Sequence, residues 1–263
     1  MPGGEASPAV HDTGTGEAVV WLHAFPLDAA QWDHQVARAS GRFRCLRFDM
    51  WGCGESPAPP DDATLDGFAA AILERLEVLG VDRFSVVGLS MGGYVAFALW
   101  RLAAPRINAL VLSNTRAGSD TDATRADREL TAERALRESS VDFLIEPNVA
   151  RLLGARAQRE AHITDPLRGM IRRWTPAGVA AAQRAMAARP DSTAMLHDIN
   201  VPVLVVAGTE DSVISRDQST AMAGAIGGAR FSEFKDCGHL ANLEVPELFG
   251  IETVDFLASA GAG

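Results

Sequence analysis

One stretch decides the fold that we predict for this chain: FSVVGLSMGG, Phe84–Gly93. It joins an apolar run of strand length to a helical pattern that begins at Met91. Ser90 lies at the junction in a G-x-S-x-G pattern, which is typical of a sharp strand-to-helix turn that exposes the serine hydroxyl. Glycine is needed beside such a turn because a Cβ would collide with neighbouring backbone. The pattern makes Ser90 a candidate nucleophile, and the alternative is a glycine-rich turn with an inert serine.

Apolar runs of strand length alternate with helical patterns on both sides of this stretch. We predict buried strands at Val19–His23, Phe43–Asp49, Phe84–Leu89, Ala109–Ser113 and Val203–Gly208, and a further strand around Arg230–Phe234. We expect helices at roughly Ala29–Ala39, Leu65–Leu79, Met91–Leu102, Arg216–Ile226 and Pro246–Leu257. This alternation predicts an α/β fold with a doubly wound, mostly parallel sheet. The segment before Val19 is short for an opening antiparallel hairpin, so we expect the first strand to be missing or frayed.

Residues 116–189 interrupt the alternation with helical stretches and no convincing strand. We interpret them as a helical cap inserted between the two parts of the α/β core, residues 1–115 and 190–263. The cap segment holds more arginine than aspartate and glutamate together, although the whole chain has a net charge of −10. One interpretation places these arginines on solvated helix faces, paired with neighbouring carboxylates. The other is a basic pocket wall that faces an anionic substrate, with Arg172 and Arg173 as candidate substrate contacts.

Composition limits the possible partners and the cellular location. A chain of 263 residues that is 47% hydrophobic and 22% charged is typical of one folded domain. The net charge of −10 argues against nucleic acid and anionic membrane surfaces as partners. The three cysteines, Cys45, Cys53 and Cys237, match neither a disulfide framework nor a zinc ligand set. Catalysis by a serine nucleophile needs no metal or organic cofactor, so we expect none. The first residues lack the pattern of a secretory signal, and we expect a cytoplasmic protein.

A serine hydroxyl needs a base to activate it and an acid to orient that base. Asp211 follows the predicted strand Val203–Gly208, at the sheet edge where catalytic groups collect, and His239 follows the last predicted strand. The order Ser90, Asp211, His239 is that of a nucleophile, acid and base in a triad. Glu210 competes for the acid role, and we expect it to be a solvated loop carboxylate instead.

The remaining histidines carry no partner motif, with one exception. His11, His34, His162 and His197 are expected on the surface or on helices. His23 ends the first predicted buried strand and begins the segment His23-Ala24-Phe25-Pro26. We expect His23 to shape this loop through hydrogen bonds and so to place the amide of Phe25.

Five motifs in sequence order resemble those of the α/β-hydrolase superfamily. They are His23–Pro26, Asp49–Ser56, Gly88–Gly93, Gly208–Asp211 and Gly238–His239. The resemblance covers nearly the whole chain outside the cap. It implies an oxyanion hole formed by the backbone N–H groups of Phe25 and Met91, whose side chains would also form apolar walls of the substrate pocket.

A narrower resemblance is to the enol-lactonases of the β-ketoadipate pathway and related small esterases. It rests on Gly88–Gly93, Ser113–Thr115 and Gly238–Glu244. Those enzymes usually have Arg and His where this chain has Trp51 and Cys53, and this departure concerns the substrate more than the triad.

The residues and the resemblance together predict a serine hydrolase that cleaves a small carboxylic ester or lactone through an acyl-enzyme. Related dehalogenases and epoxide hydrolases use an aspartate nucleophile, whereas this chain has Ser90. Carbon–carbon hydrolases of the same fold are an alternative, although they typically have Trp at the position of Leu240. A ligand-sensing homologue that retains the triad is the alternative from another functional class, and the rate of turnover separates it from an enzyme.

Overall fold

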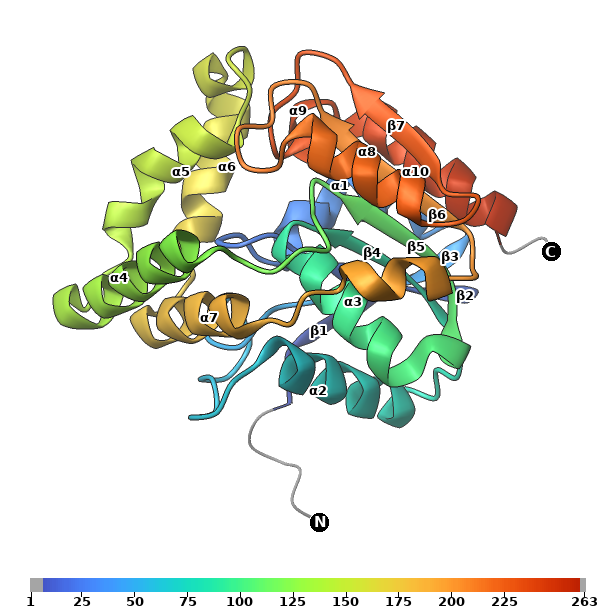
Figure 1. Ribbon diagram of the computed structural model, residues 1–263, viewed down its shortest axis with the longest axis horizontal. Coiled ribbons are helices and arrows are strands. Elements are labelled where there is room, and N and C mark those ends of the chain that lie inside the picture. The colour runs from blue at the N-terminus through green and yellow to red at the C-terminus, as the bar shows by residue number, and fades with distance from the viewer. Residues whose placement is uncertain (1–6, 261–263) are drawn as a thin grey trace.

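A single sheet of seven strands forms the centre of the part of the chain that the computed structural model describes, residues 7–260 (Figure 1). The strand order is β1-β3-β2-β4-β5-β6-β7, and every neighbouring pair is parallel except β1 and β3. The strands are β1 Val10–Thr13, β2 Glu17–Leu22, β3 Phe43–Phe48, β4 Phe84–Leu89, β5 Ile107–Ser113, β6 Val203–Gly208 and β7 Arg230–Phe234. The six strands expected from the sequence therefore lie within two residues of their predicted bounds.

The expectation of a missing or frayed first strand was wrong. β1 pairs antiparallel with β3 over its full length, from Val10 opposite Phe48 to Thr13 opposite Cys45. The short connection to β2 is possible because Gly14 and Gly16 both have positive φ and turn the chain tightly across the start of β3. A Cβ on Gly14 would collide with the carbonyl oxygen of Phe43, so this turn requires glycine.

The strand order explains how the helices cover the sheet. The chain moves from β2 to β3 in one direction and from β3 past β2 to β4 in the other. Because crossover connections between parallel strands are right-handed, this reversal puts α1 (Asp33–Ala39) on one face and α2 (Leu65–Val78) and α3 (Met91–Ala103) on the other. In agreement, α1 packs against α10 (Pro246–Ala260), and α2 packs against α3. The reversal point between β2 and β4 is where α/β sheets bind ligands, beyond the carboxyl ends of the strands.

Residues 116–189 hold four α-helices and no strand: α4 Asp122–Glu138, α5 Ile145–Leu152, α6 Ala161–Arg172 and α7 Pro176–Ala188. Figure 1 shows these helices gathered at one side of the sheet, and we call them the cap. α8 (Arg216–Ala225) and the short α9 (Ala241–Glu244) complete the helices of the core. Of the five short 3-10 segments within residues 7–260, three belong to the core and two, Asp142–Leu144 and Ala157–Arg159, belong to the cap segment. Within residues 7–260, no helix is both long and apolar enough to cross a membrane.

Many cap arginines pair with carboxylates on helix surfaces, as the first interpretation of the sequence expected. These pairs are Arg125 with Asp122, Arg134 with Glu138, Arg156 with Glu160, Arg168 with Glu146, and Arg184 with Glu129. They are largely exposed, and exposed pairs contribute little to stability.

A different arrangement surrounds Asp120, in the loop that leads from β5 into the cap. Its carboxylate is completely buried and accepts from Arg128 Nε at 2.6 Å, Arg189 Nη1 at 2.9 Å and also Arg116. Burial alone would raise the pKa of Asp120, but the hydrogen bonds and positive charges of Arg189 and Arg128 outweigh it and lower that pKa to about 2. Because Arg116 and Arg189 stand at the two ends of the cap segment and Arg128 lies on α4, this cluster ties both ends of the segment to α4.

We predict that Asp120→Asn lowers the free energy of unfolding by about 3 kcal/mol at pH 7, because it leaves buried guanidinium groups without a counter-charge. Since the folded pKa of Asp120 lies below its unfolded value near 4, the stabilisation is present above about pH 4 and is lost as pH falls towards 2. Urea unfolding at several pH values would measure both effects. The control is Asp122→Asn, whose carboxylate is fully exposed and should matter little. An equal effect of the two substitutions would contradict this account.

Candidate active site

Ser90 occupies a strained turn between β4 and α3. Its φ of 55° and ψ of −112° lie in a region that non-glycine residues rarely adopt. The turn is possible because glycine stands on both sides: a Cβ on Gly88 would collide with the Gly92 carbonyl oxygen, and one on Gly92 with the carbonyl oxygen of Leu22 at the end of β2. The Ser90 amide donates to Ser113 O at 2.9 Å, which ties the turn to β5.

Thr115 holds the same turn from the far side, and sequence reasoning missed this role. Its hydroxyl donates to the Ser90 carbonyl oxygen at 2.8 Å. A Cβ on Gly93 would collide with the Thr115 side chain, so glycine at position 93 makes room for the hydroxyl. Thr115 thus fixes the backbone of the candidate nucleophile.

His239 and Asp211 form a buried pair at the carboxyl ends of β7 and β6. His239 Nδ1 and Asp211 Oδ2 are 2.8 Å apart, and the two side chains are only 1% and 2% exposed. The second carboxylate oxygen of Asp211 accepts from the amides of Val213 at 2.8 Å and Ile214 at 3.0 Å. An ionised carboxylate can only accept, so Nδ1 is the protonated nitrogen and Nε2 keeps a free lone pair.

The acid is kept ionised by its surroundings. Burial would raise the pKa of Asp211, but the electrostatic interaction and hydrogen bond with His239, together with the side chain of Asn114 and the amide of Ile214, outweigh burial and lower it. Glu210 lies elsewhere: its carboxylate accepts from the amide of Ala155 in the cap at 2.7 Å. Of the two acids weighed from the sequence, Asp211 is therefore the one that contacts His239.

Asn114 is a second residue that sequence reasoning missed. It directly follows β5. Its side-chain amide donates to Asp211 Oδ2 at 2.9 Å, and its backbone has a positive φ of 47°. Asparagine tolerates this conformation better than most residues. The sequence did contain one indication of this role, because Asn114 is a polar residue directly after a predicted buried strand, at the sheet edge where site residues collect.

The loop that carries His239 is fastened to the cap. The His239 amide donates to the carbonyl oxygen of Leu152 at the end of α5, at 2.9 Å. The buried carboxylate of Glu244 accepts from the amide of Gly238 at 2.9 Å and from that of Gly154 at 3.1 Å. Burial raises the pKa of Glu244, and these two amides oppose that rise. The position of the imidazole therefore depends on the cap as well as on the sheet.

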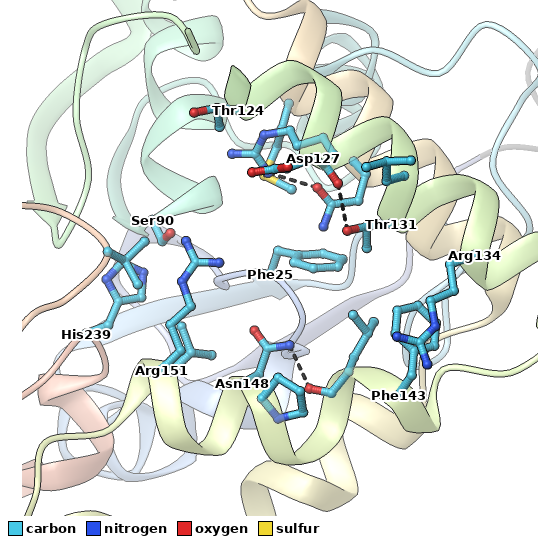
Figure 2. Close-up of a pocket in the computed structure, with 18 of the residues that line it drawn as sticks. Phe25, Ser90, Thr124, Asp127, Thr131, Arg134, Phe143, Asn148, Arg151 and His239 are labelled. Carbon is cyan, nitrogen blue, oxygen red and sulfur yellow. Dashed lines mark hydrogen bonds between the residues drawn. The ribbon is translucent and has the colours of Figure 1, made fainter. Parts of the chain in front are cut away.

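Ser90 and His239 line a pocket of about 560 Å³ between the core and the cap (Figure 2). Phe25 also lines it, as predicted, whereas the Met91 side chain is buried in the hydrophobic core and does not line this pocket. The remaining lining residues come mostly from α4, α5 and α7. A pocket of this size is typical of sites for small molecules.

The two amides predicted to form an oxyanion hole belong to Phe25 and Met91, which follow β2 and β4. These two strands are neighbours in the sheet, and their carboxyl ends meet at the switch point. Neither amide donates to another group among residues 7–260. Phe25 is held in place by the ring of Trp174, whose centroid lies 5.1 Å from its own at 71°.

Arg172 and Arg173, the predicted substrate contacts, do not line the pocket. Arg173 instead binds the buried carboxylate of Asp28. The neighbouring Trp174 donates from its indole nitrogen to Leu27 O at 2.8 Å. The turn after α6 therefore contacts the loop that carries Phe25, through Arg173 and Trp174. The arginines that do line the pocket are Arg128, Arg134 and Arg151.

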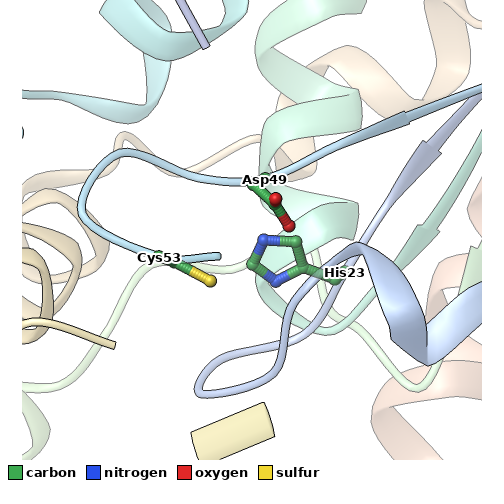
Figure 3. Close-up of side chains that lie close together, drawn as sticks. All are labelled: His23, Asp49 and Cys53. Carbon is green, nitrogen blue, oxygen red and sulfur yellow. The ribbon is translucent and has the colours of Figure 1, made fainter. Parts of the chain in front are cut away.

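His23 has the structural role that the sequence predicted. Nε2 accepts from the Met50 amide at 3.0 Å, so Nδ1 carries the proton and donates to the Ala24 carbonyl oxygen at 2.9 Å. Asp49 and Cys53 lie close by, and in the part of the chain described here these three side chains are the one cluster with the donor types and spacing of a metal site (Figure 3). Both ring nitrogens are occupied by backbone groups, and the Cys53 thiol donates to Leu27 O at 3.2 Å. The cluster therefore joins the loops after β2 and β3.

The family model for the alpha/beta hydrolase fold matches residues 17–246. A pimeloyl-[acyl-carrier protein] methyl ester esterase of Nitrosomonas europaea is 30% identical over 93% of this chain and 97% of its own length. Among solved structures, a thermophilic esterase from Thermogutta terrifontis with malate bound has a TM-score of 0.93 and 36% identity, covering 96% of this chain and 93% of that one. The enol-lactonase from Burkholderia xenovorans LB400 has a TM-score of 0.87 and 30% identity, covering 95% and 96%.

We predict that Gly92→Ala severely destabilises the protein, because its Cβ would strike the carbonyl oxygen of Leu22 and push α3 off the sheet. The control is Gly169→Ala in α6, where a Cβ meets nothing within 4 Å and should stabilise the helix by about 0.5–1 kcal/mol. Thermal unfolding measures both variants. A Gly92→Ala protein with the wild-type melting temperature would contradict the close approach between β2 and α3.

Proposed function

This chain belongs to the α/β-hydrolase fold family, and we propose that it is a serine hydrolase that cleaves a small carboxylic ester or lactone through an acyl-enzyme. The proposal rests on one observation: three side chains from separate parts of the chain come together at one wall of the pocket. Ser90 is presented on a strained turn, His239 lines the same pocket, and Asp211 holds the imidazole from behind. This arrangement supports an activated serine nucleophile.

In the first half of the reaction, Ser90 Oγ attacks the carbonyl carbon while His239 Nε2 takes the hydroxyl proton. Asp211 keeps the proton on Nδ1 and stabilises the imidazolium that forms. The negative charge on the carbonyl oxygen is held by the amides of Phe25 and Met91, assisted by the amino-terminal dipole of α3. Collapse of the tetrahedral intermediate breaks the bond to the alcohol oxygen, which leaves with the proton from His239.

In the second half, water attacks the acyl-enzyme and gives a proton to His239. The second tetrahedral intermediate releases the carboxylic acid and returns the proton to Ser90 Oγ. When the substrate is a lactone, the alcohol remains tethered to the acyl group and leaves with it. Every proton transfer uses this chain's own residues.

The size of the pocket and the identities of the relatives support a small substrate. The cap covers Ser90 and bounds a volume of about 560 Å³, which fits a short acyl group better than a long chain. The relatives named above include two esterases and an enol-lactonase. We therefore infer that short esters and lactones are preferred substrates.

We predict that Ser90→Ala and His239→Ala each reduce kcat/KM for a short p-nitrophenyl ester by about 10⁴-fold or more, because nucleophile and base act as one unit. Asp211→Asn should also be strongly impaired, since it removes the acceptor that fixes the tautomer. Glu210→Gln is the matched control and should stay near wild-type activity, because its carboxylate faces the cap backbone. An inactive Glu210→Gln beside an active Asp211→Asn would reverse the assignment of the acid.

A serine-directed organophosphonate should form a single covalent adduct at Ser90, because the turn exposes a hydroxyl that His239 activates. Intact-mass and peptide mass spectrometry would locate it, and Ser90→Ala should remain unlabelled. Inactivation without modification of Ser90 would contradict the mechanism. Steady-state turnover of esters in the same preparation separates an enzyme from a ligand-sensing homologue, and including a carbon–carbon hydrolase substrate in the panel tests that alternative.

A further inference from the structure

The pocket is more positive than the rest of the molecule. Three arginines and one aspartate line it, Arg128, Arg134, Arg151 and Asp127, although the whole chain has a net charge of −10. Several cationic side chains around one small pocket give it a positive local potential, which attracts anions even though the protein as a whole is acidic. The three arginines differ in how their charges are balanced.

Two of the three arginines already have partners. Arg128 binds the buried Asp120 and also donates to Gln183 Oε1 at 3.0 Å. Arg134 donates to Glu138 at 2.8 Å, and its guanidinium lies over the ring of Phe143, 4.2 Å from the centroid. The positive charges of these two side chains are therefore already balanced by groups within the cap.

Arg151 is different, because its guanidinium has no hydrogen-bond or ion-pair partner among residues 7–260. Figure 2 shows its side chain rising from α5 towards the wall of the pocket that holds Ser90 and His239. The single carboxylate of the pocket, Asp127, belongs to α4 instead. Within the part of the chain described, Arg151 is therefore an exposed, unpaired cation near the candidate catalytic groups.

The backbone at Arg151 is fixed relative to those groups. Its carbonyl oxygen accepts from the hydroxyl of Ser212, the residue after Asp211, at 2.9 Å. The carbonyl oxygen of the next residue, Leu152, accepts from the His239 amide at 2.9 Å. The end of α5 is thus hydrogen-bonded to the loops of both the acid and the base, which fixes the backbone from which the guanidinium extends.

We propose that Arg151 binds a carboxylate of the substrate, so that the preferred substrates are esters or lactones that carry a second carboxylate a short distance from the scissile carbonyl. This inference rests on the proposed function and specifies its substrate class. A guanidinium matches a carboxylate with two parallel hydrogen bonds, which fixes orientation as well as charge. Half-esters and lactones of short dicarboxylic acids fit both this requirement and the size of the pocket.

The test compares two esters of nearly the same shape that differ in charge: monoethyl succinate, with a free carboxylate, and ethyl succinamate, with an amide in its place. Wild-type protein should prefer the charged ester, and Arg151→Gln should lower the ratio of the two kcat/KM values by about 10- to 100-fold. The change should lie mainly in KM, because the carboxylate is bound in both the ground and the transition state. Arg151→Lys should keep part of the preference, and the wild-type preference should shrink at high salt.

The control variant is Arg172→Gln, which removes the same charge from an exposed position outside the pocket and should leave the ratio unchanged. An unchanged ratio in Arg151→Gln, or an equal loss for both esters, would overturn the proposal. Calorimetric binding of succinate, compared with succinamate, gives a readout that needs no turnover. If neither ester were hydrolysed while succinate binding still depended on Arg151, the proposed function would fail and the carboxylate site would stand. Succinate binding that is equal in wild type and Arg151→Gln would refute the site itself.

Discussion

The close approach of the β4–α3 turn to the end of β2 is the constraint on which the rest of this structure depends. Gly92 lies so near the carbonyl oxygen of Leu22 that no Cβ fits between them, and this contact lets α3 begin directly beneath Ser90. The strain at Ser90 is held by groups on β5 and just after it, because Ser113 accepts from its amide and Thr115 donates to its carbonyl oxygen. Three adjacent strands therefore cooperate to expose one hydroxyl group.

The cap also positions residues of the candidate site, in addition to covering the pocket. The carbonyl oxygen of Leu152, at the end of α5, accepts a hydrogen bond from the amide of His239. The turn after α6 binds the loop that carries Phe25 through Trp174 and Arg173. The groups proposed as base and oxyanion donor are thus each positioned by one core strand and one cap segment. Movement of the cap would disturb both at once, which couples the closing of the pocket to the alignment of the groups inside it.

The arginines of the cap show how one residue type serves several purposes in a single segment. Those on the outer helix faces pair with nearby carboxylates and contribute little to stability. Arg116, Arg128 and Arg189 surround the buried Asp120, where removal of the single negative charge would be costly. Arg151 lines the pocket, and within the described residues 7–260 its guanidinium has no ion-pair or hydrogen-bond partner. What separates these roles is burial and the distance to a carboxylate.

The sequence by itself determined the alternation of strands and helices, the place of Ser90 at the turn, and the order of Ser90, Asp211 and His239, because these depend on local hydrophobic patterns and on glycine at fixed offsets. It also indicated the role of His23, whose partners lie at the ends of two predicted strands. Only the tertiary structure decided which acid contacts His239, that Asn114 and Thr115 support the site, and that β1 pairs with β3. It also placed Arg151 in the pocket, although Arg172 and Arg173 had been favoured. The direction in which a helical side chain points depends on how its helix packs against the rest of the protein. That packing is set by contacts with residues distant in sequence, which a local sequence pattern does not reveal.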